Sequence, residues 1–345
     1  MKEKRSGKQR EKHSKRKIVP ILAVIVFICF GLGALELWEK KNDQATTAYL
    51  PEEPVIEKMT LEDEGVTYTL RDDITTYLIL GVDETLDSAH YEKEENLNNK
   101  QADFLMLMIL DRTRKTYTAL HLNRDTMMDI PRLNAYGGAD GTVCAHLNNA
   151  YSFGSGGRDS CRNTVNAVSA LLFDIPIDHY FAITMDGIPV LNDLVGGVTV
   201  HIDDDLTAID PTFTEGADVT LYGQQALSFV RARMNVTGGM NLRRMERQRS
   251  YVTALYEQVK KKLNTGTGFA LKIAETVDPY SKSDMTTDEL SQLVEKLKDY
   301  TFLGIEDMKG DIYLNPDTGY YEFLPDQGAL KKQVIGLLFE RAADK

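Results

Sequence analysis

Two apolar runs separated by five residues constrain this chain more than any other feature. FLMLMIL (104–110) and TYTALHL (116–122) both have the length and composition of buried strands. Parallel strands need a crossover of about a dozen residues or more, so the short connection predicts an antiparallel hairpin. The run TTYLILGV (75–82) lies upstream and predicts a further strand of the same domain.

The remaining pattern alternates expected helices with short expected strands. Apolar runs predict strands at 180–185, 197–202 and 311–315, and a glycine-rich loop is expected over 137–157. Periodic segments predict helices at 158–173, 187–194, 221–233, 241–263, 286–298 and 328–343. Helices and strands interspersed in this way, with one clear hairpin, predict an α/β fold in which helices cover a mixed central sheet within one domain.

A single uncharged apolar run lies near the N-terminus. As a helix, residues 18–35 (IVPILAVIVFICFGLGAL) would span about 27 Å, roughly the thickness of a bilayer core. Nine Lys and Arg precede it within residues 1–17, and Glu36, Glu39 and Asp43 follow it. The positive-inside rule therefore places the N-terminus in the cytoplasm. A cleaved signal peptide is the alternative, but the run is long for one and no small-x-small cleavage site precedes Glu36.

We therefore expect a single-pass protein of the cell membrane whose bulk is extracellular. The expected order is a cytoplasmic basic tail (1–17), a transmembrane anchor (18–38), a polar stalk or linker (39–74) and an extracellular domain (75–345). The tail carries a net charge of +7, so the whole-chain charge of −12 leaves −19 for the rest. An acidic external domain argues against nucleic-acid binding, which uses a broad basic face.

The stretch 231–249 (RARMNVTGGMNLRRMERQR) is a local basic exception within this acidic domain. It holds six arginines and one acid, Glu246. Guanidinium forks match phosphate and carboxylate oxygens two at a time, so the stretch is predicted to clamp a multiply charged phosphate. Arg231 and Arg233 lie at an expected helix end, where cations are also favoured for purely structural reasons.

A helical wheel over 241–263 separates the arginines of the second expected helix. Arg243, Arg244 and Arg247 share one flank at i, i+3 and i+4 spacing, whereas Arg249 lies near the apolar stripe. Like charges at this spacing repel unless an anion neutralises them. The flank is therefore either part of an anion site or a solvated charged face.

Acidic and basic residues also flank the three strands named first. Asp83 follows the first strand, Asp103 precedes the second, and Arg124 and Asp125 follow the third. The hairpin brings the second and third positions to one edge of the sheet, and Asp83 joins them if the first strand runs antiparallel to the second. Two carboxylates near an arginine suit Mg²⁺, which takes one or two carboxylates, waters and substrate phosphates. The alternative is that these acids lie at solvated strand ends.

The external cysteines and the histidines show no zinc pattern. Cys144 and Cys161 either form a disulfide or remain two free thiols. No C-x-x-C motif or histidine cluster is present. The scattered histidines are expected to be structural or surface residues: His121, His146, His179 and His201.

Seven motifs, taken in order, resemble those of the LytR–CpsA–Psr (LCP) family of bacterial cell-envelope proteins. They are LILGVD (78–83), ADFLMLMILD (102–111), NRDTMMDIP (123–131), LNNAYSFGSGG (147–157), LVGGVTVHI (194–202), LYGQQALSFVRAR (221–233) and RRMERQ (243–248). A basic tail and one membrane span ahead of the domain are similar to the family as well. The resemblance covers about 75–325. Single motifs are weak, but seven in this order are specific.

The resemblance implies an α/β/α sandwich that buries a lipid tail, and a phosphotransferase. Such proteins move a glycopolymer, either a teichoic acid or a capsular or wall polysaccharide, from a polyprenyl-pyrophosphate carrier to peptidoglycan. By motif position, Asp83 and Asp103 correspond to the Mg²⁺-binding acids. The arginines expected around the pyrophosphate are Arg124, Arg231, Arg233, Arg244 and Arg247, and Asp125 and Gln248 also fall in family motifs.

The resemblance frames two further expectations about the site. Asp125 or Asp103 would orient or deprotonate the attacking sugar hydroxyl. Apolar residues on 104–110 and 180–185 would line a slot for the lipid tail, although strand residues of this kind also form ordinary core.

One stretch departs from the family pattern Asp-x-Gly-Arg-x-x-Arg-Gln. The same frame begins here with Asn241-Leu242-Arg243, so Asn replaces the Asp and Arg replaces the Gly. Asn keeps an N-cap role, but an acid that braced an arginine would be lost, and Arg243 would add charge or crowd the site. Two alternatives to transfer therefore stay open: a non-catalytic binder or regulator of lipid-linked precursors, and a polyprenyl-pyrophosphate hydrolase.

Overall fold

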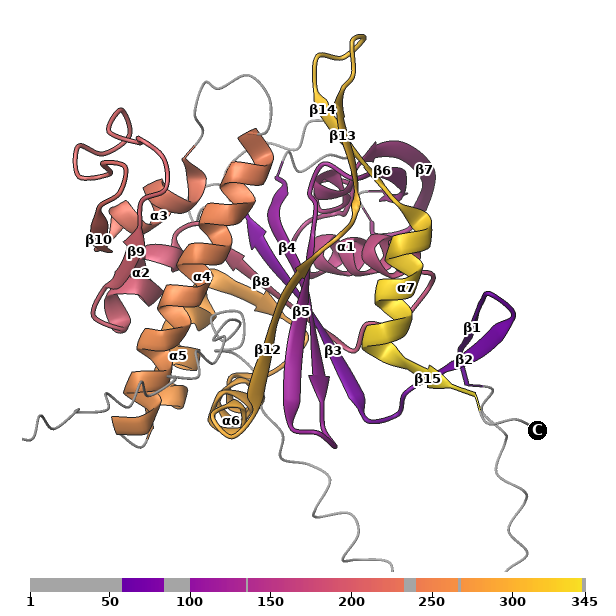
Figure 1. The fold of residues 1–345 in the computed structure, drawn as a ribbon, viewed down its shortest axis with the longest axis horizontal. Helices are drawn as coiled ribbons and strands as arrows, with labels where there is room; N and C mark the ends of the chain where they lie inside the picture. The colour runs from indigo at the N-terminus through magenta and orange to yellow at the C-terminus, as the bar shows by residue number, and fades with distance from the viewer. Residues whose placement is uncertain (1–57, 84–99, 135, 233–239, 266–267, 343–345) are drawn as a thin grey trace, which may run out of the picture.

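A six-stranded mixed sheet of order β11-β8-β3-β4-β5-β12 forms the centre of the protein (Figure 1). The computed structural model describes residues 58–342 except 84–99, 135, 233–239 and 266–267. The six strands are β3 (Ile74–Val82), β4 (Ala102–Asp111), β5 (Thr116–Leu122), β8 (His179–Thr184), β11 (Ser281–Ser283) and β12 (Thr301–Asp307). Strands β4 and β5 form the predicted antiparallel hairpin, and β3 runs antiparallel to β4 as the site prediction required. Strands β8 and β12 pair in parallel with β3 and β5, which makes the sheet mixed.

Strand β4 is buried on both faces because its side chains alternate between two cores. Met106 and Met108 belong to one core, and Leu107 and Ile109 belong to the other, as the period of two in a strand requires. Each fully buried apolar side chain of this size contributes roughly 1.5–3 kcal/mol of transfer free energy. The uninterrupted apolar run in the sequence therefore reflects a sheet that is covered on both sides.

Helices cover both faces of the sheet and form a three-layered sandwich (Figure 1). One face is covered by α1 (Gly157–Leu171) and α7 (Gln327–Leu338). The other is covered by α2 (Gly187–Leu194), α3 (Gln224–Arg231), α4 (Met240–Thr265), α5 (Phe269–Val277) and α6 (Thr287–Leu297). Helix α6 opens with a reciprocal capping box between Thr286 and Glu289, which fixes its start where the sequence predicts it.

Smaller sheets at the periphery account for most of the strands that the sequence pattern does not predict. The hairpins are β6 (Met127–Leu133) with β7 (Ala139–His146), β9 (Val198–His201) with β10 (Asp218–Leu221), and β13 (Gly310–Leu314) with β14 (Tyr321–Pro325). The loop expected over 137–157 is wrong for β7 and for the 3-10 helix Leu147–Ala150. Most of β7 is exposed and lacks apolar alternation, so its pairing with β6 leaves little signal in the sequence.

The two ends of the domain meet in a three-stranded sheet. It consists of β1 (Thr60–Asp63), β2 (Val66–Leu70) and β15 (Phe339–Arg341). The expected stalk is therefore wrong for residues 60–70, which are strands of the folded domain. The helix expected to reach residue 343 ends at Leu338, because Phe339 pairs with Leu70 instead of continuing the helix. Pairing with a distant strand overrides local helix propensity here.

Two sequence-based expectations about the N-terminus and the cysteines have different outcomes. The basic tail and the apolar run 18–35 lie outside the described residues. Within the part of the chain that the structure describes, no helix is both long and apolar enough to span a bilayer. Cys144 and Cys161 are free thiols, the former exposed and the latter buried in α1. Of the two alternatives for this pair, a disulfide or two free thiols, the second is therefore correct.

Candidate active site

The ends of β3, β4 and β5 meet at one edge of the central sheet, as predicted. Val82 pairs with Ala102, and Leu105 pairs with Leu122. Asp83, Asp103 and Arg124 therefore lie at the same rim. The one difference is that Asp103 is the second residue of β4 and does not precede the strand.

Arg124 joins the acids of the rim. One of its terminal nitrogens, Nη1, donates to Oδ1 of Asp103, and its Nε donates to Oδ1 of Asp125 at 3.1 Å. Its Nη2 donates to Oε1 of Gln101 at 3.1 Å. The side chain is only 11% exposed, so these charge-assisted hydrogen bonds hold the guanidinium in one orientation.

Gln101, which the sequence reasoning missed, connects Asp83 to the rest of the rim. Its backbone N–H donates to Oδ1 of Asp83 at 2.5 Å, and its Oε1 also accepts from Nδ2 of Asn148 at 3.1 Å. Asp83 thus reaches Arg124 through Gln101. An uncharged glutamine beside a strand has no signature of its own, and only the three-dimensional pairing reveals its role.

Helix α4 places Arg244 on the other oxygen of Asp103. The distance from Nη1 of Arg244 to Oδ2 of Asp103 is 3.4 Å, and the Arg244 side chain is buried. The Asp103 carboxylate therefore lies between two guanidinium groups, one on each oxygen. The strand β4 and the helix α4 contribute opposite charges to the same point.

Arg247, one turn after Arg243 on α4, contacts the end of α3 and Asp204. Its Nη1 lies 3.3 Å from Oδ2 of Asp204, and its Nη2 donates to the carbonyl of Ala232 just after α3. Burial lowers the pKa of this guanidinium and Asp204 opposes that effect. Arg247 thus ties α4 to the end of α3, and Asp204 is a partner that the sequence reasoning missed.

The three arginines of the predicted flank differ in burial, and Arg243 follows the alternative of a solvated charged face. Its side chain is 61% exposed and lies 3.5 Å from Asp204 and 3.9 Å from Glu246, whereas Arg244 and Arg247 are buried. The wheel treats the polar flank as uniform, but packing of α4 against the sheet rim and the end of α3 buries only part of it. Arg249 forms an ion pair with Asp307 at the end of β12, consistent with its exclusion from the predicted site.

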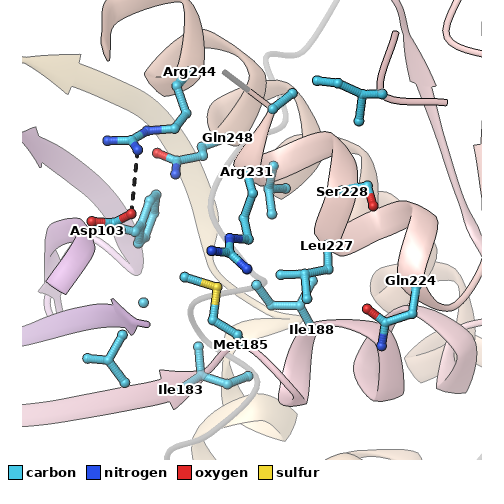
Figure 2. A pocket seen from close by; sticks show the side chains of 16 residues that line it. Asp103, Ile183, Met185, Ile188, Gln224, Leu227, Ser228, Arg231, Arg244 and Gln248 are labelled. Atoms are coloured by element: carbon cyan, nitrogen blue, oxygen red, sulfur yellow. Dashed lines mark hydrogen bonds and ion pairs between the residues drawn. The ribbon is translucent and has the colours of Figure 1, made fainter. Parts of the chain in front are cut away.

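A cavity of about 630 Å³ opens between the sheet rim and helices α2, α3 and α4 (Figure 2). Its polar lining includes Asp103, Arg231, Arg244 and Gln248, and Figure 2 shows the Asp103–Arg244 pair at one side with Arg231 facing the same space. Its apolar lining comes from β8, α2 and α3, at Ile183, Met185, Ile188 and Leu227. The cavity thus combines guanidinium groups with an apolar wall.

An apolar slot of about 100 Å³ continues from this cavity toward the core. The two spaces share Phe104, Ile183, Ile188 and Val230, and the slot is completed by Phe181, Leu191, Tyr251, Val252 and Leu255 among others. Phe104, Phe181 and Ile183 come from the strands expected to line a lipid slot, while the rest of β4 is ordinary core. Gln248 lies at the junction, and its buried Oε1 accepts no hydrogen bond from the described residues.

A second cleft of about 590 Å³ lies beyond the rim, beside the hairpins β6–β7 and β13–β14. Arg124 and Asp125 line it, and Arg244 is the residue whose side chain lines both this cleft and the cavity. The cleft is polar and aromatic, with amides from Gln101, Asn148 and Asn149 and rings from His146, Tyr320 and Tyr321. The family-motif residues therefore lie between two spaces of different chemistry.

Three of the four histidines are structural or surface residues, as expected. His121 is fully buried in β5, where desolvation lowers its pKa to about 3. His179 and His201 pair with Asp284 at 3.2 Å and with Asp218 at 2.8 Å. Both partners are carboxylates, and the hydrogen bond raises the pKa of each ring. His146 lines the second cleft.

A known protein family matches this chain, in agreement with the order of its motifs and with the geometry of the rim and the two spaces. The model of the LytR_cpsA_psr family matches residues 38–334. This chain belongs to that family. The sequence-based resemblance is thereby confirmed over most of the chain's length.

Relatives of this LytR_cpsA_psr protein include proteins named as teichoic acid transferases. A protein of Enterococcus faecalis (strain ATCC 700802 / V583), named polyisoprenyl-teichoic acid–peptidoglycan teichoic acid transferase TagU, is 28% identical over 284 residues, or 81% of this chain and 82% of that protein. Protein gbs0355 of Streptococcus agalactiae shares the fold with a TM-score of 0.62 at 22% identity, over 79% of this chain and 91% of that one. TagT bound to LI-WTA superposes with a TM-score of 0.57 at 21% identity, over 77% and 91%.

Within the LytR_cpsA_psr motifs of this chain, the residues divide by position. Asp103, Arg231, Arg244 and Gln248 line the cavity, while Arg124 and Asp125 line the second cleft. Arg247 lies behind them as a tie between helices. Arg233 and the side chain of Asn241 lie outside the described residues, so the Asn241 departure stays a sequence-based observation. The Arg243 departure points away from the site, because that side chain is exposed and lines neither space.

The carboxylates at the rim determine whether the site can hold the expected Mg²⁺. Among the described residues, no three His, Cys, Asp or Glu side chains are grouped closely enough to hold a metal ion by themselves. Mg²⁺ commonly uses one or two carboxylates and takes its other ligands from water and substrate phosphates, so Asp83 and Asp103 fit such a site. Both oxygens of Asp103 already accept from arginines, and a carboxylate has further lone pairs for a cation. Mg²⁺ binding at these two acids therefore depends on an anionic substrate that balances the positive charge of the neighbouring arginines.

Proposed function

We propose that this chain transfers a glycopolymer from a polyprenyl-pyrophosphate carrier to a hydroxyl of peptidoglycan. The observation that carries the proposal is the cavity, in which Arg231 and the Asp103–Arg244 pair stand at the mouth of an apolar slot. A ligand that fills both must join a multiply charged head to an apolar tail. The names of the relatives support the same substrate class, as a teichoic acid or another wall or capsular polysaccharide.

The reaction proposed is a phosphoryl transfer. The acceptor oxygen forms a bond to the phosphorus nearer the glycan, and the bond from that phosphorus to the bridging oxygen of the pyrophosphate breaks. Polyprenyl phosphate leaves with the negative charge, and the hydroxyl proton passes to a carboxylate. Guanidinium groups that are already oriented stabilise such developing charge without reorganisation.

Arg231 and Arg244 are proposed to bind the pyrophosphate from the cavity side. Arg231 is exposed at the end of α3, so its head can reach a ligand, whereas Arg244 is fixed by burial and by Asp103. Arg124 is proposed to bind from the side of the second cleft, where its side chain is held by three acceptors. Arg247 and Gln248 support these groups from α4. Arg233 is proposed to bind the pyrophosphate as well, on the basis of its family motif alone.

Asp125 is proposed as the group that accepts the hydroxyl proton. It lines the second cleft, and its Oδ1 accepts from Nε of Arg124. Asp103 is less suited to this role because arginines occupy both of its oxygens. The geometry thus favours Asp125 among the two carboxylates that the motifs suggest.

Asp83 and Asp103 are proposed to hold Mg²⁺ together with the pyrophosphate. When bound, the cation would neutralise charge on the phosphates and act as a Lewis acid. The chain's own contribution is the placement of Asp83, which the backbone N–H of Gln101 orients toward the rim.

The chain is proposed to act at the outer face of the bacterial cell membrane, anchored by residues 18–38. The support is the uncharged run 18–35 with its basic N-terminal flank. A membrane-held enzyme would meet a polyprenyl carrier whose tail resides in the same bilayer.

The test is a transfer assay with the full chain in detergent, a lipid-linked glycan donor and peptidoglycan glycan strands. Wild-type protein should form glycopolymer linked to peptidoglycan and release polyprenyl phosphate. Donor binding without turnover would support the non-catalytic alternative, and release of polyprenyl phosphate without acceptor would support the hydrolase. Either result would overturn the transfer proposal.

A further inference from the structure

The second cleft has a lining that differs from that of the lipid slot. Its walls combine the amides of Gln101, Asn148 and Asn149 with the hydroxyl of Thr318 and the charged groups of the rim. Asn148 is 1% exposed, its Nδ2 donates to Gln101, and its Oδ1 accepts no hydrogen bond from the described residues.

Aromatic side chains form the outer edge of the same cleft. Tyr320, just before β14, is 68% exposed and packs edge-on against His146 of β7 with ring centroids 6.5 Å apart. Large exposed aromatic rings supported from behind are suited to contact a ligand, because they present much apolar area at little cost in conformational entropy. Sugars bind through this combination, in which the C–H face stacks on a ring and the hydroxyls bond to amides.

The hairpin that carries Tyr320 is joined directly to the proposed base. The backbone N–H of Phe323 in β14 donates to the carbonyl of Asp125 at 2.9 Å, and Thr126 forms a parallel bridge with Phe323. Figure 1 shows β13–β14 projecting above β6–β7 at this side of the molecule. The aromatic edge and the carboxylate therefore belong to one continuous wall.

We propose that the second cleft binds the glycan strand of peptidoglycan as acceptor, with Tyr320 as the stacking surface for a sugar ring. This inference rests on the proposed function. The attacking and leaving oxygens in phosphoryl transfer lie roughly in line across the phosphorus. The lipid phosphate leaves toward the slot, so the hydroxyl enters from the other side of Arg244, where the cleft and Asp125 lie. This placement favours the acceptor over the glycan of the donor.

The first test measures binding without catalysis. Soluble glycan strands of alternating N-acetylglucosamine and N-acetylmuramic acid are titrated into the full chain in detergent. Tyr320→Ala should weaken binding about five- to twentyfold, while Tyr320→Phe should stay close to wild type because the ring is kept. Leu314→Ala is the matched control, since Leu314 is 52% exposed on the same hairpin and does not line the cleft. Equal binding by Tyr320→Ala and wild type would overturn the proposal.

The second test separates acceptor from donor in the transfer reaction. Tyr320→Ala should raise KM for the glycan strands by a similar factor and leave KM for the lipid-linked donor within about twofold. A rise in the donor KM alone would assign the cleft to the donor's glycan and overturn the proposal. If wild-type protein binds strands through Tyr320 but transfers nothing, the cleft is confirmed as a glycan site and the proposed function fails instead.

Discussion

Asp103 and Arg244 join the central sheet to helix α4 across the candidate site, with Oδ2 and Nη1 3.4 Å apart. Arg124 occupies the other oxygen of the same carboxylate. A carboxylate shared by two guanidinium groups holds both in place before any substrate arrives. The resulting site is preorganised for anions, and its parts come from segments more than a hundred residues apart in the chain.

Removal of the Arg244 guanidinium should impair chemistry more than folding. We expect Arg244→Ala to lower the transfer rate about 10²–10³-fold, the usual effect of deleting one donor that stabilises an oxyanion. Arg243→Ala is the matched control because that neighbouring side chain is 61% exposed and lines neither space. Turnover in the lipid-linked transfer assay distinguishes them, and similar rates in the two variants would refute this role for Arg244.

Replacement of Arg247 should instead reduce stability. Arg247→Ala leaves Asp204 and the Ala232 carbonyl without this partner, so we expect the free energy of unfolding to fall by about 2–4 kcal/mol. Urea unfolding of the variant against wild type measures the loss. A double-mutant cycle with Asp204→Asn should show positive coupling, and strict additivity would mean that the ion pair contributes nothing.

The proposed base can be tested by an isosteric change. Asp125→Asn keeps an oxygen that can accept from Nε of Arg124 but cannot take a proton near neutral pH. We expect kcat to fall about 10²–10⁴-fold with donor affinity little changed. A variant that retains wild-type kcat would exclude Asp125 as the proton acceptor.

The metal proposal predicts a specific dependence on Mg²⁺. Chelation should abolish transfer and added Mg²⁺ should restore it. In Asp83→Asn the Gln101 N–H keeps an acceptor, so the fold should survive while the Mg²⁺ concentration for half-maximal activity rises at least about tenfold. Full activity in a chelator would rule out the cation, whatever the behaviour of the variant.

Buried His121 predicts how stability responds to acid. Desolvation, assisted by Arg249, lowers its pKa to about 3 in the folded state, against a usual value near 6.5 when unfolded. The unfolded chain therefore binds one more proton between these values, and stability should fall as pH drops below about 6.5, by at most about 1.4 kcal/mol per pH unit from this group. Urea unfolding of wild type and His121→Leu between pH 7 and pH 4.5 should show a shallower slope in the variant. Identical slopes would contradict the assignment.

The parts of the fold that could be predicted from sequence are those that local patterns determine. The run of β4 is apolar from Phe104 to Leu110 because this strand is buried on both faces, β5 is mostly buried, and α2 falls on the predicted residues. Strand β7 has no comparable signal, since it is mostly exposed. The end of helix α7 could not be predicted either, because it is set by the pairing of Phe339 with Leu70, a residue distant in sequence.

The candidate site divides in the same way. Asp103 and Arg124 could be placed together from hairpin geometry alone, and Asp83 joined them on the assumption, confirmed by the structure, that β3 runs antiparallel to β4. Gln101 and Asp204 could not, because only the fold brings their partners near. Gln101 contacts Asp83, Arg124 and Asn148, and Asp204 contacts Arg243 and Arg247. The burial of Arg244 and the exposure of Arg243, adjacent on one helix, likewise follow from how α4 packs and not from its own periodicity.

The backbone contacts that Phe323 makes with Asp125 and Thr126 separate the placement of the proposed base from the binding of the acceptor. The position of Asp125 depends on the base of the β13–β14 hairpin, while Tyr320 sits at its far end. The tip of this hairpin can therefore be replaced without moving Asp125. A different turn grafted between Leu314 and Tyr321 should therefore change which acceptor glycan the enzyme binds. It should leave Asp125 and the arginines of the site in place. This hairpin is thus the segment to change in order to direct the enzyme to a new acceptor.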